Sequence, residues 1–244
     1  ISGVPEGATL SAGTDNGDGS WTLTTEQLEG LTVTPAANSD EDFQLTVTAT
    51  TTDGTDTATV SETVDVTVNA VADEADLNVS DASGAEDTAI PLTISSELTD
   101  TDGSETLSVT ISGVPAGATL SAGTDNGDGS WTLAPDQLEG LSITPAANSD
   151  ADFQLTVTAT TTDGTDTTSV SETLDVTVDA VADAPTLDVA DAAGTEDTAI
   201  PLDITSGLSD ADGSETLSVT ISGVPAGATL SAGTDNGDGT WTLS

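Results

Sequence analysis

The sequence predicts an all-β protein made of tandem antiparallel β-sandwich domains of the immunoglobulin type. Apolar residues alternate with Thr, Ser or Asp at a period of two, which is typical of half-buried strands. Clusters of Gly, Asp, Asn and Pro interrupt these runs every 8–14 residues or so. The 244-residue chain also repeats itself every 110 residues, a length that suits a complete domain rather than a solenoid unit. A β-barrel is the alternative fold for the same pattern.

The repeat sets the expected domain boundaries. Residues 1–110 and 111–220 are identical at 87 positions, and a third copy starts at Ile221. The run NAVAD at Asn69, which returns as DAVAD at Asp179, reads as a short linker before a new strand. We therefore expect the C-terminal part of one repeat, one complete repeat, and the N-terminal part of the next, in residues 1–72, 73–182 and 183–244. Since the chain opens inside a repeat, we expect it to be a window on a longer array.

The complete repeat is predicted to hold seven or eight strands, the number typical of an immunoglobulin-type sandwich. Alternating apolar sets mark the longest of them: Ile90, Leu92 and Ile94; Leu107, Val109 and Ile111; Trp131 and Leu133; Leu155, Val157 and Ala159; Leu174, Val176 and Val178. Thr at the intervening positions suits the solvated face of a sheet. The expected strands are residues 77–80, 88–95, 105–112, 117–121, 129–133, 141–144, 152–161 and 168–179, with a helical turn at 135–139.

The composition excludes whole classes of partner. The chain has no Lys, Arg or His and 44 Asp plus Glu, so its formal charge is −44. No side chain can neutralise a phosphate, which excludes nucleic acid, or attract an anionic membrane surface. No run of apolar residues approaches the length of a membrane span. Every carboxylate must therefore face water, accept hydrogen bonds or bind a metal ion.

The same composition argues against an enzyme and for a hard metal ion. Without His, Cys, Lys or Tyr, only carboxylates and hydroxyls remain for catalysis. A paired-carboxylate glycosidase is the alternative. Such sites usually lie in a cleft lined by aromatic residues, and this chain has few of them, three Trp and two Phe. Zero Cys excludes disulfides and thiolate sites. Oxygen-only ligands favour calcium over zinc or copper.

The expected chain path gathers acidic loops at the two ends of each sandwich. Loops 97–105 and 163–166 are expected at one pole, together with the hairpin 125–129. The turn 80–87, the segment 148–152 and the exit linker are expected at the other pole. One repeat's lower pole meets the next repeat's upper pole, so carboxylates crowd at each junction and repel unless cations bind between them.

Two sets of candidate metal ligands follow, one for each junction. The second junction is expected to collect Glu86, Asp87, Asp150, Asp152, Asp179, Asp183, Asp210, Asp212 and Glu215. The set for the first junction and the upper pole of the complete repeat comprises Asp40, Asp42, Asn69, Asp73, Asp100, Asp102, Glu105, Asp163 and Asp166. The alternative is that these are solvated turns, because Asp and Asn favour turns for local reasons. That alternative is weakest for D-T-D-G-S-E at 100–105, which presents three carboxylates in one turn.

The strings EDTAIPL, DTDGSETLSVTISGVPAGATLSAG, NGDGSWTL and DFQLTVTATTTDGTDT, with the linker AVADAP, resemble the tandem extender repeats of giant RTX-type bacterial adhesins. The resemblance covers the whole chain. It implies cadherin-like domains strung into a linear rod, calcium at the junctions, export by type I secretion, and an extracellular location on the bacterial surface.

The resemblance to cadherins also implies ligand roles. Glu86, or its copy Glu196, resembles the glutamate between the first two strands, and Asp150 with Asp152 resembles the acidic pair before the sixth. Asp179 and Asp183 lie where the acidic linker lies, and Asp210 with Asp212 resembles the D-x-D of the next domain. The first junction departs from the pattern, since Asn69 replaces the Asp found at 179 and Glu74-Ala75 replaces Ala184-Pro185.

These observations predict a calcium-rigidified structural spacer that projects an adhesive region away from the cell. Its expected partners are calcium ions and neighbouring repeats of the same chain. The alternative is a binding module that pairs with itself or contacts glycans, or a protein that self-associates through shared calcium into filaments or matrix. The solvent exposure of Trp131 distinguishes the spacer from a glycan-binding module. A buried Trp packs in the core, whereas an exposed one could stack on a sugar.

Overall fold

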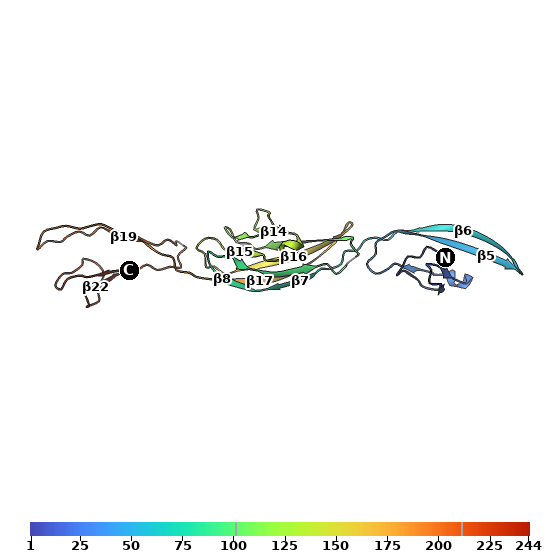
Figure 1. The fold of residues 1–244 in the computed structure, drawn as a ribbon, viewed down its shortest axis with the longest axis horizontal. Coiled ribbons are helices and arrows are strands. Elements are labelled where there is room, and N and C mark those ends of the chain that lie inside the picture. Colours follow the sequence, from blue (N-terminus) through green and yellow to red (C-terminus); the bar gives the residue numbers. More distant parts are fainter. Residues whose placement is uncertain (101, 211) are drawn as a thin grey trace.

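The computed structural model describes residues 1–100, 102–210 and 212–244, and within these ranges the chain is all-β. Its helical elements there are two 3-10 turns, η1 (Thr25–Leu28) and η2 (Pro135–Gln137). The molecule is elongated, and three segments follow one another along its longest axis (Figure 1). We call residues 1–72 the N-terminal segment, 73–182 the central segment and 183–244 the C-terminal segment.

The central segment holds most of the sheet structure. Its strands are β7 (Asp76–Ser80), β8 (Ala82–Ala85), β9 (Ile90–Pro91), β10 (Thr93–Glu97), β11 (Glu105–Ser112), β12 (Thr119–Leu120), β13 (Thr124–Asp125), β14 (Ser130–Leu133), β15 (Ser142–Thr144), β16 (Phe153–Asp163) and β17 (Asp166–Asp179). They form a six-stranded sheet in the order β13-β14-β11-β16-β17-β8, a three-stranded sheet β12-β15-β9 and the pair β10-β7. All pairs are antiparallel except β8, which runs parallel to the end of β17.

The core of the central segment follows from the alternation of apolar and polar residues. Leu155, Val157 and Ala159 are buried, while the Thr residues between them lie on the other face of β16. One apolar cluster joins residues from the six-stranded and three-stranded sheets, including Ile111 and Ile143. Trp131 is partly buried and packs against this cluster, as a packing role predicts.

Most expected strands are confirmed to within a few residues, and β11 matches its predicted bounds. The single strand expected at 88–95 is wrong: the chain forms β9 and β10, separated at Leu92, whose N–H donates to the carbonyl of Leu141. Strand β8 was not expected because its sequence, ASGA, lacks apolar alternation. The pairing of β8 with β17 is a tertiary contact that the residues of β8 alone do not predict.

The hairpin 125–129 lies at the other end of the sheet from the predicted one. Ser130, directly after the hairpin, pairs with Ser112 at the end of β11, and Ser112 also pairs with Thr156 near the start of β16. Glu105 begins β11 at the opposite end. A single strand at 117–121 would carry the chain to the upper pole, whereas the chain forms the two short strands β12 and β13 and stays at the lower end.

The terminal segments contain the corresponding parts of the repeat with fewer partners. The N-terminal segment has β1 (Thr9–Leu10), β2 (Thr14–Asp15), β3 (Trp21–Thr22), β4 (Val33–Thr34), β5 (Phe43–Asp53) and β6 (Asp56–Val66). The C-terminal segment has β18 (Thr186–Val189), β19 (Ile204–Gly207), β20 (Val219–Ser222), β21 (Thr234–Asp235) and β22 (Thr240–Leu243). A small buried cluster of Val4, Ala8, Leu10 and Leu45 forms the core of the N-terminal segment.

Candidate metal centres

A cluster of three carboxylates joins the central and C-terminal segments. Glu86 lies just after β8, and Asp210 and Asp212 lie in the loop after β19; one carboxylate oxygen from each lies within 4.8 Å of the others. Glu86 Oε1 accepts a hydrogen bond of 2.6 Å from the N–H of Val181 in the linker. Asp210 Oδ1 accepts one of 2.9 Å from the N–H of Asp212. This bridging cluster is therefore held by backbone donors from the linker and from its own loop.

The bridging cluster lacks a positive counterpart. Glu86 and Asp210 are both buried, and two carboxylate charges within 4.8 Å of each other repel by at least about 3.5 kcal/mol at an effective dielectric constant near 20. Glu86 Oε2 is buried with no hydrogen-bond partner. Because the chain contains no Lys, Arg or His, the positive charge that would stabilise these oxygens must come from solution.

Asp212 is the exposed member of the bridging cluster, and its charge is supported by donors. The Ser214 hydroxyl, which also donates to Asp210 Oδ2 at 3.4 Å, and then the Ser214 N–H lower the pKa of Asp212 below its ordinary value. The Ser214 N–H lies 2.7 Å from Asp212 Oδ1, and the Asp150 N–H adds a smaller effect in the same direction. Asp212 therefore stays ionised to lower pH than an ordinary Asp.

A second cluster lies at the upper pole of the central segment. Asp73, Asp100 and Glu105 each place a carboxylate oxygen within 4.8 Å of the others, and Asp100 and Glu105 are buried. Glu105 Oε1 accepts a 2.5 Å hydrogen bond from the N–H of Asp73, while Glu105 Oε2 is buried without a partner. The hydroxyl of buried Thr161 donates to the Asp73 carbonyl. The sequence does not single out Thr161, because it lies in a run of Thr with no local signal.

The turn between β16 and β17 places two more acidic residues, Asp163 and Asp166, near this second cluster. Asp163 pairs with Glu105 in the β11–β16 register and is buried, with its Oδ1 unpartnered. Asp166 Oδ2 accepts a 3.0 Å hydrogen bond from the N–H of Ala72 and so holds the linker. Asp102 is exposed, and hydrogen bonds from the hydroxyl and then the N–H of Ser104 lower its pKa.

Other predicted ligands hold the backbone near the junctions instead of joining a cluster. Asp87 Oδ1 accepts from the N–H of Asn148, at 2.8 Å. Asp152 and its counterpart Asp42 each accept a 2.8 Å hydrogen bond from the N–H of a linker-proximal Val. In each of these three side chains, one carboxylate oxygen accepts a hydrogen bond from a backbone N–H close to a junction.

The remaining candidates line cavities at the two junctions. At the second, a cavity of about 430 Å³ is lined by residues that include Asp150, Asp183 and Glu215. The N–H of Asp183 donates to Glu215 Oε1, and Glu215 Oε2 is buried without a partner. The Asp179 carbonyl accepts from the N–H of Glu86. At the first junction, Asp40 and Asn69 line a cavity of about 360 Å³ together with Asp73 and Asp163.

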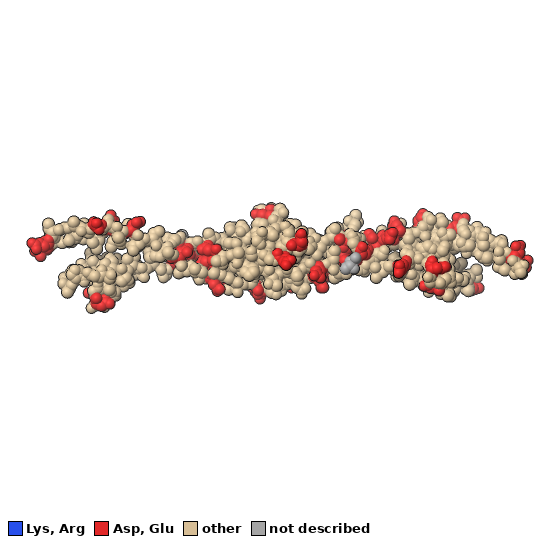
Figure 2. All heavy atoms as spheres, in the orientation of Figure 1, with Lys and Arg blue, Asp and Glu red and all other residues tan. Residues whose placement is uncertain are grey.

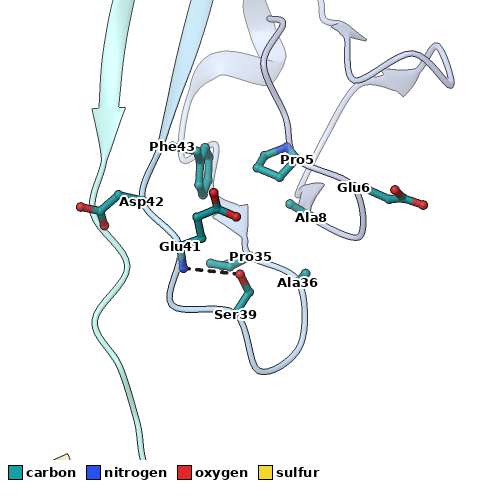
Figure 3. A pocket seen from close by; sticks show the side chains of 9 residues that line it. All are labelled: Pro5, Glu6, Ala8, Pro35, Ala36, Ser39, Glu41, Asp42 and Phe43. Carbon is teal, nitrogen blue, oxygen red and sulfur yellow. Dashed lines mark hydrogen bonds between the residues drawn. The ribbon is translucent and has the colours of Figure 1, made fainter. Parts of the chain in front are cut away.

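A further cavity lies inside the N-terminal segment, away from both clusters (Figure 3). It measures about 300 Å³, and Pro5, Pro35 and Phe43 form much of its wall. Glu41 and Glu6 lie on its rim, at positions where the central segment has Ala. The sequence pattern therefore does not maintain an acidic site here.

The face drawn in Figure 2 shows Asp and Glu along the whole molecule, with groups where neighbouring segments meet. The described residues include no helix that is both long enough and apolar enough to cross a membrane.

Comparisons with known proteins give no family. No protein-family model matches the chain, and no curated protein matches it. One solved structure with some similarity is that of the surface layer protein SbsC, domains 4–9, at 18% sequence identity. The match covers 87% of this chain and 31% of that one with a TM-score of 0.23, which is too low to establish a shared fold.

Proposed function

We propose that the chain is a calcium-rigidified spacer of a large bacterial cell-surface adhesin. In this proposal, immunoglobulin-like, cadherin-like sandwiches form a linear rod that projects an adhesive region away from the cell. The observation that carries the proposal is the bridging cluster of Glu86, Asp210 and Asp212, which joins two segments and includes a buried, unpartnered carboxylate oxygen. The resemblance of the repeat to extender domains supports the same function.

Calcium fits these clusters by ligand chemistry. It accepts six to eight oxygens from carboxylates, carbonyls and water with flexible geometry, whereas magnesium demands a near-ideal octahedron and gives up its waters reluctantly. The second junction offers Glu86, Asp210 and Asp212, with Glu215 lining the adjoining cavity. The clusters supply oxygen ligands of this kind, and a chain without His or Cys adds no imidazole or thiolate to them.

Rigidity follows from binding across the junction. An ion that contacts Glu86 and Asp210 together binds the aligned arrangement more tightly than a bent one, and it shifts the population by that difference in affinity. A spacer needs this property and needs no reaction centre, so we propose that the chain is not an enzyme. No observation favours glycan contact, since Trp131 packs against the core.

The test is thermal unfolding of the 244-residue chain at low ionic strength in excess calcium, excess magnesium and excess chelator. We expect calcium to raise the melting temperature substantially relative to chelator, and magnesium to raise it much less. High monovalent salt should recover part of the loss, because it screens the carboxylates to about 10 Å at 0.1 M. A melting curve that chelator leaves unchanged would contradict the proposal.

A further inference from the structure

Each copy of the repeat carries one Asn-Gly pair, and the three pairs lie in the same tight hairpin. They are Asn16-Gly17, Asn126-Gly127 and Asn236-Gly237. In the complete central repeat the pair follows β13, and the N–H of Asn126 donates to the carbonyl of Ser130 at the start of β14. Gly127 has a positive φ of 82°, a conformation that suits glycine. The turn therefore explains the glycine, but a glycine after Asn also has a chemical consequence.

Asn followed by Gly is prone to deamidation, because glycine has no side chain to hinder attack by its own nitrogen. At Asn126, the Gly127 nitrogen would lose its proton and attack the side-chain Cγ. The N–Cγ bond forms as the Cγ–Nδ2 bond breaks, and the amide leaves with that proton as ammonia. Water then opens the cyclic imide at either carbonyl, which leaves aspartate or isoaspartate. Asn126 is exposed, so burial does not keep water from it.

The hairpin holds both reacting groups in hydrogen bonds. The Gly127 N–H, which must lose its proton, donates to Asp125 Oδ1 at 2.8 Å. An anion at this distance stabilises the protonated nitrogen and opposes its deprotonation. The Asn126 amide nitrogen, which must leave, donates to Ser130 Oγ at 3.0 Å and to Thr132 Oγ1 at 3.1 Å. These two bonds hold the side chain against β14 and oppose its rotation towards the Gly127 nitrogen.

The Ser130 hydroxyl is oriented to accept from the Asn126 amide. Its own proton is donated to Asp128 Oδ1, at 2.6 Å, which leaves its lone pairs for Asn126. This hydrogen bond, followed by the one from the Ser130 N–H, lowers the pKa of Asp128 below its ordinary value. Asp128 therefore stays ionised, and an ionised carboxylate is a poor target for the analogous attack by the Gly129 nitrogen.

The other two copies keep these contacts even where the residue changes. In the first copy, the amide of Asn16 also donates to two hydroxyls, at 2.9 and 3.2 Å. In the third, Thr240 stands in the place of Ser130, yet its hydroxyl accepts from Asn236 at 2.9 Å and donates to Asp238 at 2.6 Å. The replacement retains the hydroxyl, which is the group that makes both contacts.

We propose that this hairpin is a deamidation site that the fold protects, and that the hydroxyl of Ser130 and of its copies provides the protection. Deamidation of Asn126 would place a third carboxylate within two residues of Asp125 and Asp128. It would also remove the amide donor whose two hydrogen bonds tie the hairpin to β14. Protection therefore preserves both the structure and the charge of the hairpin. No metal ion takes part, so this inference does not rest on the proposed function.

The test follows all three Asn-Gly pairs in one molecule of the 244-residue chain. The chain is incubated in mildly alkaline buffer, either folded or in urea. Cleavage after Glu then gives the peptides 7–26, 106–139 and 216–244, each of which holds one pair. Mass spectrometry detects the change from amide to carboxyl, and chromatography separates aspartate from isoaspartate. Asn126 should deamidate about tenfold more slowly, or slower still, in the folded chain than in urea. Equal rates would overturn the proposal.

Ser130→Ala removes one hydroxyl and leaves the other two hairpins as internal controls. Asn126 should deamidate several-fold faster in this variant, while Asn16 and Asn236 of the same molecule keep their rates. Ser130→Thr is the matched control, because Thr already stands at position 240, and it should leave the rate at Asn126 unchanged. An unchanged rate in Ser130→Ala, or equal acceleration in Ser130→Thr, would also overturn the proposal.

Asp128→Ala separates protection by the hydroxyl from a general loosening of the hairpin. It removes the acceptor of the Ser130 N–H and hydroxyl, at 3.1 and 2.6 Å, but keeps the hydroxyl beside Asn126. Deamidation of Asn126 should therefore accelerate less than in Ser130→Ala. Acceleration as large as in Ser130→Ala would mean that rigidity alone protects Asn126, and the assigned role of the hydroxyl would be wrong.

Discussion

The two junctions are built from nearly the same sequence, yet their carboxylates meet differently. At the second junction, Glu86 of the central segment approaches Asp210 and Asp212 of the C-terminal segment, so the cluster spans two segments. At the first, Asp73 of the linker approaches Asp100 and Glu105, and all three belong to the central segment. The first cluster therefore lies within one segment, whereas the second spans two segments.

The largest effect is expected from Glu86→Gln, which removes the carboxylate that the central segment places in the bridging cluster. Calcium affinity at the second junction should fall by on the order of tenfold or more, since fewer charged ligands remain. Spin labels on Ser171→Cys and Thr229→Cys report this junction as a distance distribution during a calcium titration. Glu172→Gln, an exposed change away from both clusters, is the control. Equal broadening in both variants would contradict the assignment.

Glu105→Gln should change the stability of the central segment with opposite signs in two conditions. In chelator it removes a buried charge from a repelling cluster, and the melting temperature should rise by a few degrees. In calcium it removes a ligand, and the melting temperature should fall. The Gln oxygen can still accept from the Asp73 N–H, so the local backbone is kept. A change of the same sign in both conditions would mean that no ion binds there.

A smaller effect is expected from Asn69→Asp, which gives the first junction the linker Asp that the second junction has at position 179. Asn69 lines the cavity that also includes Asp73 and Asp163, so the added charge should strengthen calcium binding there by a few-fold. Labels on Ser61→Cys and Ser171→Cys measure the first junction during the titration. Val71→Thr, a change in the same linker without charge, should leave the midpoint where it was.

The smallest effect concerns pH. Asp212 has a lowered pKa, so the charge it contributes is present at neutral pH and is lost only as pH falls through that lowered value. Ser214→Ala removes the hydroxyl donor, raises the pKa of Asp212 towards the ordinary value of about 4, and should move the acid loss of calcium binding at the second junction to higher pH. Ser104→Ala should act in the same way on Asp102 at the first. Calcium titrations over the acidic range measure both shifts.

The repeat period, the strands with clear alternation and the lack of any cationic side chain follow from the amino-acid sequence alone. Strands such as β11 and β16 were predictable because one face of each is buried and the other is solvated. Apolar and polar residues therefore alternate along the strand with a period of two. The lack of Lys, Arg and His likewise means that no cationic side chain can balance crowded carboxylates, wherever the fold brings them together.

Only the tertiary structure decided which carboxylates meet. Glu86 and Asp87 are neighbours with the same charge, yet Glu86 joins the bridging cluster and Asp87 accepts from the Asn148 N–H instead. Asp87 has a positive φ of 58°, which turns the chain at that residue and sends the two side chains to different partners. The sequence shows that acidic residues lie in loops, but a cluster depends on backbone turns and on contacts between residues more than 100 positions apart, such as Glu86 and Asp210. Those contacts exist only once the sheets have packed and the linker has placed one segment against the next.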